Sequence, residues 1–372
     1  MAAVTQKQKD EVIKSFQFEG DLVSQAPYGS GHINDTFLLE FEIAEMGRLK
    51  VILQRMNREV FKKPVELMEN VMGVTSYLRE RIIENGGDPE RETLNVIPTK
   101  DGKPYYLDSC GDYWRCYRFI TDASCYDQVE KPEDFYESAV AFGNFQRLLA
   151  GYPAETLHET IEGFHDTRAR FGVFKKAVAD DVMGRADSVR EEIQFVLDRE
   201  DVADYFSELL DKKELPLRVT HNDTKLNNIM IDDKTGKGIC VIDLDTVMPG
   251  LAMNDFGDSI RFGASTAAED EQDLTKVSCS MELFELYTKG FIEGCGGKLT
   301  EKEIRLLPMG AKVMTFECGM RFLTDYLQGD VYFKTHREGH NLDRCRTQFK
   351  LVADMEKKWQ TMQEIVEKYI NV

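Results

Sequence analysis

The period of apolar positions changes along the chain and divides it into two parts. From residue 5 to 18 apolar side chains recur at helical spacing, which predicts a short leading helix. Residues 35–43 and 48–56 then form apolar, partly alternating runs joined by the turn sequence "AEMG", so we expect a hairpin. A long helical pattern follows over 62–87 and ends in two glycines. Further strand-like pieces lie at 93–99, 104–108 and 112–121.

Beyond residue 121 helical patterns dominate. They cover 132–150, 166–184, 189–210, 270–294, 301–328 and 343–369. One strand-like island, Leu217–Thr246, interrupts them. This order predicts an α+β, bilobal protein-kinase-like fold. Residues 1–121 would form a small antiparallel-sheet lobe that carries the nucleotide phosphate loop. Residues 122–372 would form a large, mainly helical lobe that carries the catalytic loop, the metal site and the acceptor site.

The island contains the residues best suited to phosphoryl transfer. In "VTHNDTKLNN" the form H-x-D-x-x-x-x-N is met by His221, Asp223 and Asn228, and Asp243 follows at the end of a second strand. Phosphoryl transfer needs a carboxylate that accepts the proton of the attacking hydroxyl, and oxygen ligands that hold Mg²⁺ against the phosphates. We expect Asp223 to be this base, Asn228 and Asp243 to be the ligands, and His221 to shape the loop. Asp245 would support the metal site or serve as a turn residue.

A second acidic motif, "NDFGDSI", spells the DFG of protein kinases. Asp255 in this motif lies beyond Pro249 and Gly250, whereas Asp243 stands at the end of the hairpin strand. We therefore expect Asp243 to do the work of the kinase DFG aspartate. Asp255 would begin a helix as a cap or brace the catalytic loop.

The motifs expected to bind the nucleotide are less distinctive than those of the catalytic loop. Gly29-x-Gly31 lies between two strand-like segments, and the loop from Gly29 to Asn34 would cover the phosphates, although an ordinary hairpin turn uses the same glycines. The following strand, "KVILQRM", lacks the lysine that kinases place there. Arg55 is the expected substitute and Gln54 the alternative, because neighbouring strand residues point to opposite faces.

Two further expectations concern the same lobe. The acidic partner of this substitute on the next helix would be Glu66 or Glu69. The strand "WRCYRFITD" should lead into the connection between the lobes, which would place Tyr117 and Phe119 near the adenine.

Composition excludes several other functions. The chain has 66 acidic and 47 basic residues, a net charge of −19, which repels nucleic-acid phosphates and anionic lipid surfaces. No apolar run approaches the length of a membrane span, and the eight cysteines show no paired spacing, as expected of free thiols in a reducing cytosol. We expect a cytoplasmic protein that binds small molecules, with no nucleic-acid or membrane partner and no obligate protein partner evident.

Several motifs together resemble a known family. "YGSGHIN", "LQRMN", "VTHNDTKLNN", "IDLDT", "DFGDSIRFGAST" and "ECGMRFLTDYLQGDVYF" resemble the aminoglycoside phosphotransferase and choline kinase-like superfamily, and within it the N-acetylhexosamine 1-kinases, from about residue 12 to residue 365. The resemblance implies ATP-dependent, Mg²⁺-assisted phosphorylation of the anomeric hydroxyl of GlcNAc or GalNAc. It also implies that His32, Asp223, Arg321 and Tyr332 bind the sugar.

Two other functions stay open at this stage. One is another small-molecule hydroxyl kinase of the superfamily, which would act on a different sugar, on choline or on an aminoglycoside-like substrate. The other is a non-catalytic nucleotide-binding pseudokinase. The presence of Asp223, Asn228 and Asp243 together argues against the pseudokinase.

Overall fold

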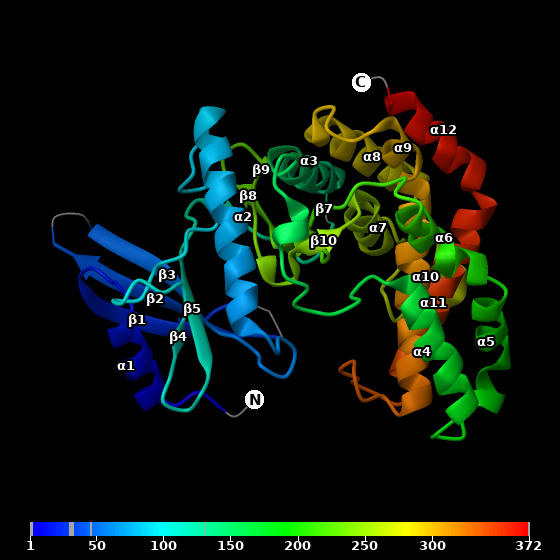
Figure 1. Ribbon diagram of the computed structural model, residues 1–372, viewed down its shortest axis with the longest axis horizontal. Helices are drawn as coiled ribbons and strands as arrows, with labels where there is room; N and C mark the ends of the chain where they lie inside the picture. Colours follow the sequence, from blue (N-terminus) through cyan, green and yellow to red (C-terminus); the bar gives the residue numbers. More distant parts are fainter. Residues whose placement is uncertain (1–2, 30–32, 45–46, 130, 371–372) are drawn as a thin grey trace.

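The computed structural model describes residues 3–29, 33–44, 47–129 and 131–370, and it shows two lobes (Figure 1). The chain begins with α1 and then builds a five-stranded antiparallel sheet in the order β1-β2-β3-β5-β4. The elements of this lobe are α1 (Gln6–Ser15), β1 (Asp21–Pro27), β2 (Asp35–Ile43), β3 (Gly47–Arg55), α2 (Pro64–Glu84), β4 (Tyr106–Leu107) and β5 (Tyr113–Arg118). The predicted hairpin is confirmed as β2 and β3. The predicted strand at 93–99 is reduced to single bridges at Val96 and Thr99.

The two faces of this sheet pack against different partners. Leu53 and Trp114 point to the face that α1 covers. Ile52 and Tyr117 point to the opposite face, toward α2 and the helical lobe. Because successive strand residues alternate between faces, this assignment also fixes which polar residues of β3 and β5 look toward the other lobe.

The helical lobe also contains short strands and single-turn helices. These are β6 (Ala123–Ser124), β7 (Arg218–Thr220), β8 (Ile229–Asp232), β9 (Gly238–Val241) and β10 (Met248–Gly250), with η1 (Ala154–Thr156), η2 (Ala186–Val189), η3 (Leu226–Asn228), η4 (Leu244–Thr246) and η5 (Leu274–Lys276). The catalytic motif lies between β7 and η4. β8 pairs antiparallel with β9 as predicted, and β10, which was not predicted, pairs with β7.

The helices of this lobe are α3 (Pro132–Leu148), α4 (Thr167–Asp180), α5 (Arg190–Leu197), α6 (Glu200–Asp211), α7 (Ala252–Gly263), α8 (Met281–Cys295), α9 (Glu301–Arg305), α10 (Leu307–Gln328), α11 (His340–Lys357) and α12 (Trp359–Tyr369). The segments predicted at 189–210, 301–328 and 343–369 each form two helices. The helix predicted from residue 270 begins at Met281, because the Ser280 side chain caps its first turn by accepting a hydrogen bond from the Leu283 N–H.

Close packing of α7 against α10 positions the catalytic loop. Gly257 lies against Gly310, and a Cβ on Gly257 would collide with the Gly310 carbonyl oxygen. From α7, Asp255 and Asp258 accept hydrogen bonds from backbone N–H groups of the loop after β7.

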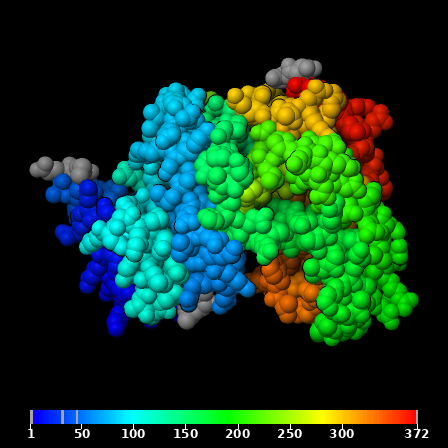
Figure 2. Space-filling view, in the orientation of Figure 1, coloured from blue at the N-terminus to red at the C-terminus, as the bar shows by residue number. Residues whose placement is uncertain are grey.

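The lobes share a buried apolar cluster that holds them together. Leu67 and Val71 of α2 pack in one cluster with Phe145 of α3 and Val247 of the catalytic region. Figure 2 shows the light-blue surface of α2 in contact with the green surface of the helical lobe. In the part of the chain that the structure describes, no helix combines the length and apolarity required to cross a lipid bilayer.

Candidate active site

The loop after β7 is built around the peptide that joins Asn222 to Asp223. Asn222 has a left-handed φ of 65°, a conformation that asparagine tolerates better than most residues. The Asp223 N–H donates to His221 Nδ1 at 3.3 Å, and His221 Nε2 lies 2.8 Å from the Ile242 carbonyl. Since carbonyl oxygens only accept, the buried His221 ring is protonated at Nε2 and accepts at Nδ1. This arrangement agrees with the loop-shaping role expected of His221.

Asp255 braces this loop from α7. Its carboxylate accepts from the N–H groups of His221 at 3.0 Å and Asn222 at 2.8 Å, and from Gln146 Nε2 at 3.0 Å. Burial of the carboxyl raises its pKa, while these donors oppose that shift. Asp255 therefore braces the loop, as one of the two alternatives predicted. It does not cap α7, whose N-cap is Leu251.

Asp223 is partly exposed and lies among groups that fit a catalytic base. Lys225 Nζ lies 2.7 Å from Asp223 Oδ1. Asn228 Nδ2 donates to the Asp223 carbonyl at 2.8 Å, which leaves the Asn228 amide oxygen for another ligand. The charges of Asp223 and Asp258 raise the pKa of Lys225 against the effect of its burial. Lys225 was missed in the sequence, although it lies two residues after the predicted base.

Asp243 has a left-handed φ of 57° and follows β9 at the point where Ile242 N–H donates to the Asn228 carbonyl at 2.9 Å. Water reaches its side chain, yet surrounding protein atoms desolvate the carboxyl. This desolvation and the charges of Asp245 and Asp223 raise the pKa of Asp243 to about 7. Within the described residues no side chain donates a hydrogen bond to it.

The residues at this position fit Mg²⁺. The carboxylate of Asp243 and the free amide oxygen of Asn228 are hard oxygen ligands, and Mg²⁺ is commonly held by one or two carboxylates together with substrate phosphates. The described residues contain no group of three or more His, Cys, Asp or Glu side chains arranged to hold an ion by themselves. A metal at this position would therefore rely on Asn228 and on the nucleotide for its remaining ligands.

Asp245 joins the two lobes. It forms a buried ion pair with Arg115 of β5 and accepts from Asn34 Nδ2 at 2.7 Å. The Asn34 amide oxygen accepts from the Asn57 N–H at 2.9 Å. The amide of Asn34, predicted to bind nucleotide, is thus engaged on both sides, and Asp245, which lies in η4, binds two residues of the sheet lobe.

The expectation that Arg55 replaces the phosphate-binding lysine finds no support in this geometry. Arg55 lies on the α1 face of the sheet, where Nε donates to Asp35 at 2.9 Å and Nη1 to Asp112 at 3.1 Å. Gln54, the alternative, faces the other lobe, and its Oε1 accepts from Arg115 Nε at 3.0 Å. Alternation from Tyr117 would have identified Arg115 as the inward-facing cation of this sheet.

The expected acidic partners on α2 also bind elsewhere. Glu66 pairs with Lys63, and Glu69 pairs with His158. Neither contacts Arg115, whose carboxylate partner is Asp245.

The remaining nucleotide residues lie along the sheet and the connection. Gly29 has a φ of 79°, which favours glycine, while Gly31 and His32 lie outside the described residues. The rings of Tyr28 and Phe119 meet edge to face at 5.7 Å, so the start of the glycine loop lies against the connection between lobes. Tyr117 is buried, and the Arg115 guanidinium lies 5.2 Å from the centre of its ring.

Arg321 and Tyr332 come together with two further aromatic rings. The Arg321 guanidinium lies between 5.4 and 5.7 Å from the ring centres of Phe164, Tyr332 and Phe333. Asp325 fixes the segment after α10, because its carboxylate accepts from three successive backbone N–H groups, those of residues 331 to 333. In Figure 1 this orange segment extends toward the sheet lobe. We call Arg321, Tyr332, Phe164 and Phe333 the acceptor wall, because Arg321 and Tyr332 are the residues expected to bind the acceptor.

One helical turn before Arg321, the buried Glu317 connects this wall to the catalytic loop. It accepts from Thr167 Oγ1 at 2.7 Å and lies 2.9 Å from His165 Nδ1. His165 Nε2 lies 3.3 Å from the carbonyl oxygen of Asn222, the residue before Asp223. Burial raises the pKa of Glu317, but His165, Arg170 and Arg321 outweigh burial and lower it. No local pattern in the sequence identified His165.

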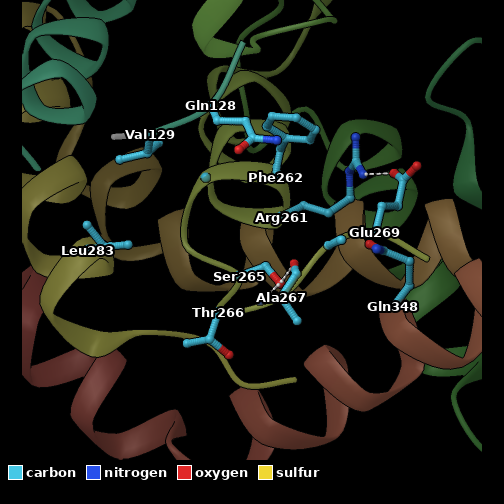
Figure 3. A pocket seen from close by; sticks show the side chains of 12 residues that line it. Gln128, Val129, Arg261, Phe262, Ser265, Thr266, Ala267, Glu269, Leu283 and Gln348 are labelled. Carbon is cyan, nitrogen blue, oxygen red and sulfur yellow. Dashed lines mark hydrogen bonds and ion pairs between the residues drawn. The ribbon is translucent and has the colours of Figure 1, made fainter. Parts of the chain in front are cut away.

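A separate cavity of about 430 Å³ lies beside Arg261 of α7 (Figure 3). Arg261 and Glu269 form part of its wall, and Nη1 of Arg261 donates to Glu269 at 2.8 Å. Arg261 also binds Asp258, which accepts from the Thr224 N–H at 3.0 Å. The cavity is lined by none of the predicted site residues.

The fold and site together define a bilobal kinase-like phosphotransferase. The sequence profile described as phosphotransferase enzyme family, APH, matches residues 24–277, and the chain belongs to this family.

Solved structures share the fold at low identity. An aminoglycoside phosphotransferase from Alicyclobacillus acidocaldarius subsp. acidocaldarius DSM 446 is 11% identical with a TM-score of 0.61, over 100% of this chain and 98% of that chain. A choline kinase from Cryptosporidium parvum Iowa II is 15% identical with a TM-score of 0.56, over 94% and 93%. An amicoumacin kinase in complex with AMP-PNP and Ca²⁺ is 12% identical with a TM-score of 0.57, over 92% and 91%.

Proposed function

We propose that the protein transfers the γ-phosphoryl group of ATP to the anomeric hydroxyl of an N-acetylhexosamine, GlcNAc or GalNAc, with Mg²⁺ as the metal. Family membership supports ATP-dependent transfer to a small-molecule hydroxyl. The structurally similar amicoumacin kinase carries AMP-PNP and Ca²⁺, which supports a nucleotide and a divalent cation at the corresponding site here.

In this proposal the chain's own residues orient the acceptor and handle its proton. Asp223 accepts the proton of the anomeric hydroxyl, which is more acidic than that of an ordinary alcohol. The hydroxyl oxygen bonds to the γ-phosphorus in line as the bond from that phosphorus to the β–γ bridging oxygen breaks, and ADP leaves. Lys225, 2.7 Å from Asp223, supplies positive charge beside the transferring group. Mg²⁺ would be held by Asp243 and Asn228 and would neutralise phosphate charge.

The charge of the acceptor wall is the observation that carries the choice of substrate. Arg321 and Arg170 place two cations beside one carboxylate, Glu317, and burial together with the charge of Arg321 lowers the pKa of Arg170. Such surroundings repel a cationic acceptor such as choline. A neutral sugar can instead receive hydrogen bonds from the planar Arg321 guanidinium and stack on exposed Tyr332.

A panel of acceptors tests this proposal. ADP release would be measured with GlcNAc, GalNAc, glucose, galactose, choline and an aminoglycoside. We expect release with the N-acetylhexosamines and none with the two cationic acceptors. Release with choline and not with the sugars would contradict the proposal and favour the amine-bearing class of acceptor.

Two further expectations belong to the proposal. The cytoplasmic location is supported by eight cysteines that all lack a disulfide partner. The assembly of Asp223, Asn228 and Asp243 around one short hairpin supports an active enzyme rather than a pseudokinase.

A further inference from the structure

We propose that His165, held by Glu317, is a positioning residue that sets the direction of Asp223. The inference rests on phosphoryl transfer at the loop after β7 and not on the identity of the sugar. It connects the acceptor wall to the catalytic base through two side chains.

Two imidazole rings hold the peptide between Asn222 and Asp223, one at its carbonyl and one at its N–H. Its carbonyl oxygen lies 3.3 Å from His165 Nε2, and its N–H donates to His221 Nδ1 at 3.3 Å. Asp255 fixes the preceding N–H groups from the α7 side. Because this peptide directly precedes the Cα of Asp223, its rotation would swing the Asp223 side chain away from its present direction.

Both ring nitrogens of His165 face oxygen acceptors, Glu317 Oε1 at 2.9 Å and the Asn222 carbonyl. These oxygens only accept, so each contact is made through a ring N–H, and the buried carboxylate of Glu317 fixes the ring plane. Glu317 is in turn fixed by Thr167 Oγ1 at 2.7 Å. The ring is only 10% exposed, so water cannot readily replace either contact.

The same helix carries the acceptor contact. Glu317 and Arg321 are four residues apart on α10, and residues at this spacing share one helical face. Phe164, the neighbour of His165, lies 5.6 Å from the Arg321 guanidinium. An acceptor held by the wall and the base that must reach its hydroxyl are thus placed by one connected group of side chains.

Geometry of this kind affects turnover more than binding. A displacement of about 1 Å in a reacting group lowers the rate by about 100-fold, so loss of the His165 contact is expected to lower kcat by roughly 10- to 100-fold. Nucleotide affinity should stay unchanged, because Asn228 and Asp243 do not contact His165 in the described structure.

The experiment compares His165→Ala, His165→Gln and Glu317→Gln with wild type. Each protein would be tested for kcat, acceptor KM, affinity for Mg·AMP-PNP and thermal midpoint. His158→Gln is the matched control, because His158 lies in the same segment and pairs with Glu69, away from the loop. We expect His165→Ala and Glu317→Gln to lower kcat with unchanged nucleotide affinity. His165→Gln should recover part of kcat, since its amide can still donate to the Asn222 carbonyl.

Two results would overturn the inference. One is an unchanged kcat in folded His165→Ala and His165→Gln. The other is a fall in kcat accompanied by an equal fall in nucleotide affinity, which would show that His165 has a general structural role. If the sugar assignment fails instead, wild type itself shows no turnover with N-acetylhexosamines, and the variants are then compared with the acceptor that the panel identifies.

Discussion

The two ends of the active site differ in charge. At the expected nucleotide end, desolvation and the charges of Asp245 and Asp223 raise the pKa of Asp243 to about 7. At the proposed acceptor end, the charges of Arg321 and Arg170 dominate. The acidic end matches what any phosphotransferase needs for a metal and a base. The cationic end carries the proposed choice of acceptor, so we expect specificity to reside there.

The acidic end is tested most severely by Asp223→Asn. The asparagine amide cannot take up the proton of the sugar hydroxyl. Because loss of a general base lowers rates by about 100- to 10,000-fold, we expect kcat to fall in that range. The fold and nucleotide affinity should persist, as measured by calorimetry with Mg·AMP-PNP. Asp233→Asn, at an exposed position of the same hairpin, should behave as wild type. A near-normal rate for Asp223→Asn would show that the base lies elsewhere.

The second largest effect is expected for Asp243→Asn, which should abolish the response of the protein to Mg²⁺. The folded protein raises the pKa of Asp243 from its ordinary 3.8 to about 7. The folded state therefore holds this proton more tightly than the unfolded chain, and the metal-free protein loses stability as pH rises through that window. Asparagine avoids this loss, so at pH 8 the metal-free variant should melt higher than wild type.

The two proteins should also respond differently to Mg²⁺. With AMP-PNP present, the ion should raise the melting temperature of wild type and leave that of Asp243→Asn unchanged, because a ligand stabilises only the state that binds it. Thermal melts across pH with and without Mg²⁺ measure both effects. An equal response of the two proteins to Mg²⁺ would contradict the role assigned to Asp243.

At the opposite end, Arg321→Gln should weaken the acceptor alone. A hydrogen bond from a charged donor contributes about 1.5–3 kcal/mol, so sugar KM should rise roughly 10- to 100-fold while ATP KM is unaffected. Arg321→Glu should in addition reduce discrimination against choline. Arg190→Gln, which removes an exposed arginine paired with Asp187, is the control. Equal changes in sugar KM and ATP KM would place Arg321 outside the acceptor site.

Substitution of Asp255 should lower stability without affecting the chemistry of the site. Among these variants, its effect on metal binding should be the smallest. Asp255→Asn weakens three hydrogen bonds to a buried carboxylate, so unfolding free energy should fall by about 2–3 kcal/mol. Mg²⁺ affinity should stay near that of wild type. Denaturant unfolding and calorimetry measure the two quantities. A selective loss of Mg²⁺ affinity would return Asp255 to the role that its DFG spelling suggests.

The fold was largely predictable because strong periodicity marks its elements. The β2–β3 hairpin, α2 and the β8–β9 hairpin all follow from local pattern. The breaks near residues 199, 306 and 358 were not predicted, because continuous helical periodicity on both sides conceals a change of direction. Ser280 is a recognisable cap that the pattern of apolar positions alone overlooked.

Within the site, residues of one short loop were predictable and long-range partners were not. His221, Asp223, Asn228 and Asp243 share a single hairpin with fixed spacing. Arg115 becomes a partner of the site only when β5 is placed beside β3, and alternation then selects Gln54 rather than Arg55. His165 reaches the loop from a connecting segment whose sequence carries no such signal.

Phosphorus NMR of the products tests the central claim most directly, because it reports both the acceptor and the oxygen that receives the phosphoryl group. Reactions with ATP, Mg²⁺ and GlcNAc, GalNAc, glucose, galactose or choline would be followed in parallel. The account predicts a sugar 1-phosphate resonance coupled to the anomeric proton with the N-acetylhexosamines, and no phosphocholine. Phosphocholine, or phosphate on another sugar hydroxyl, would contradict it.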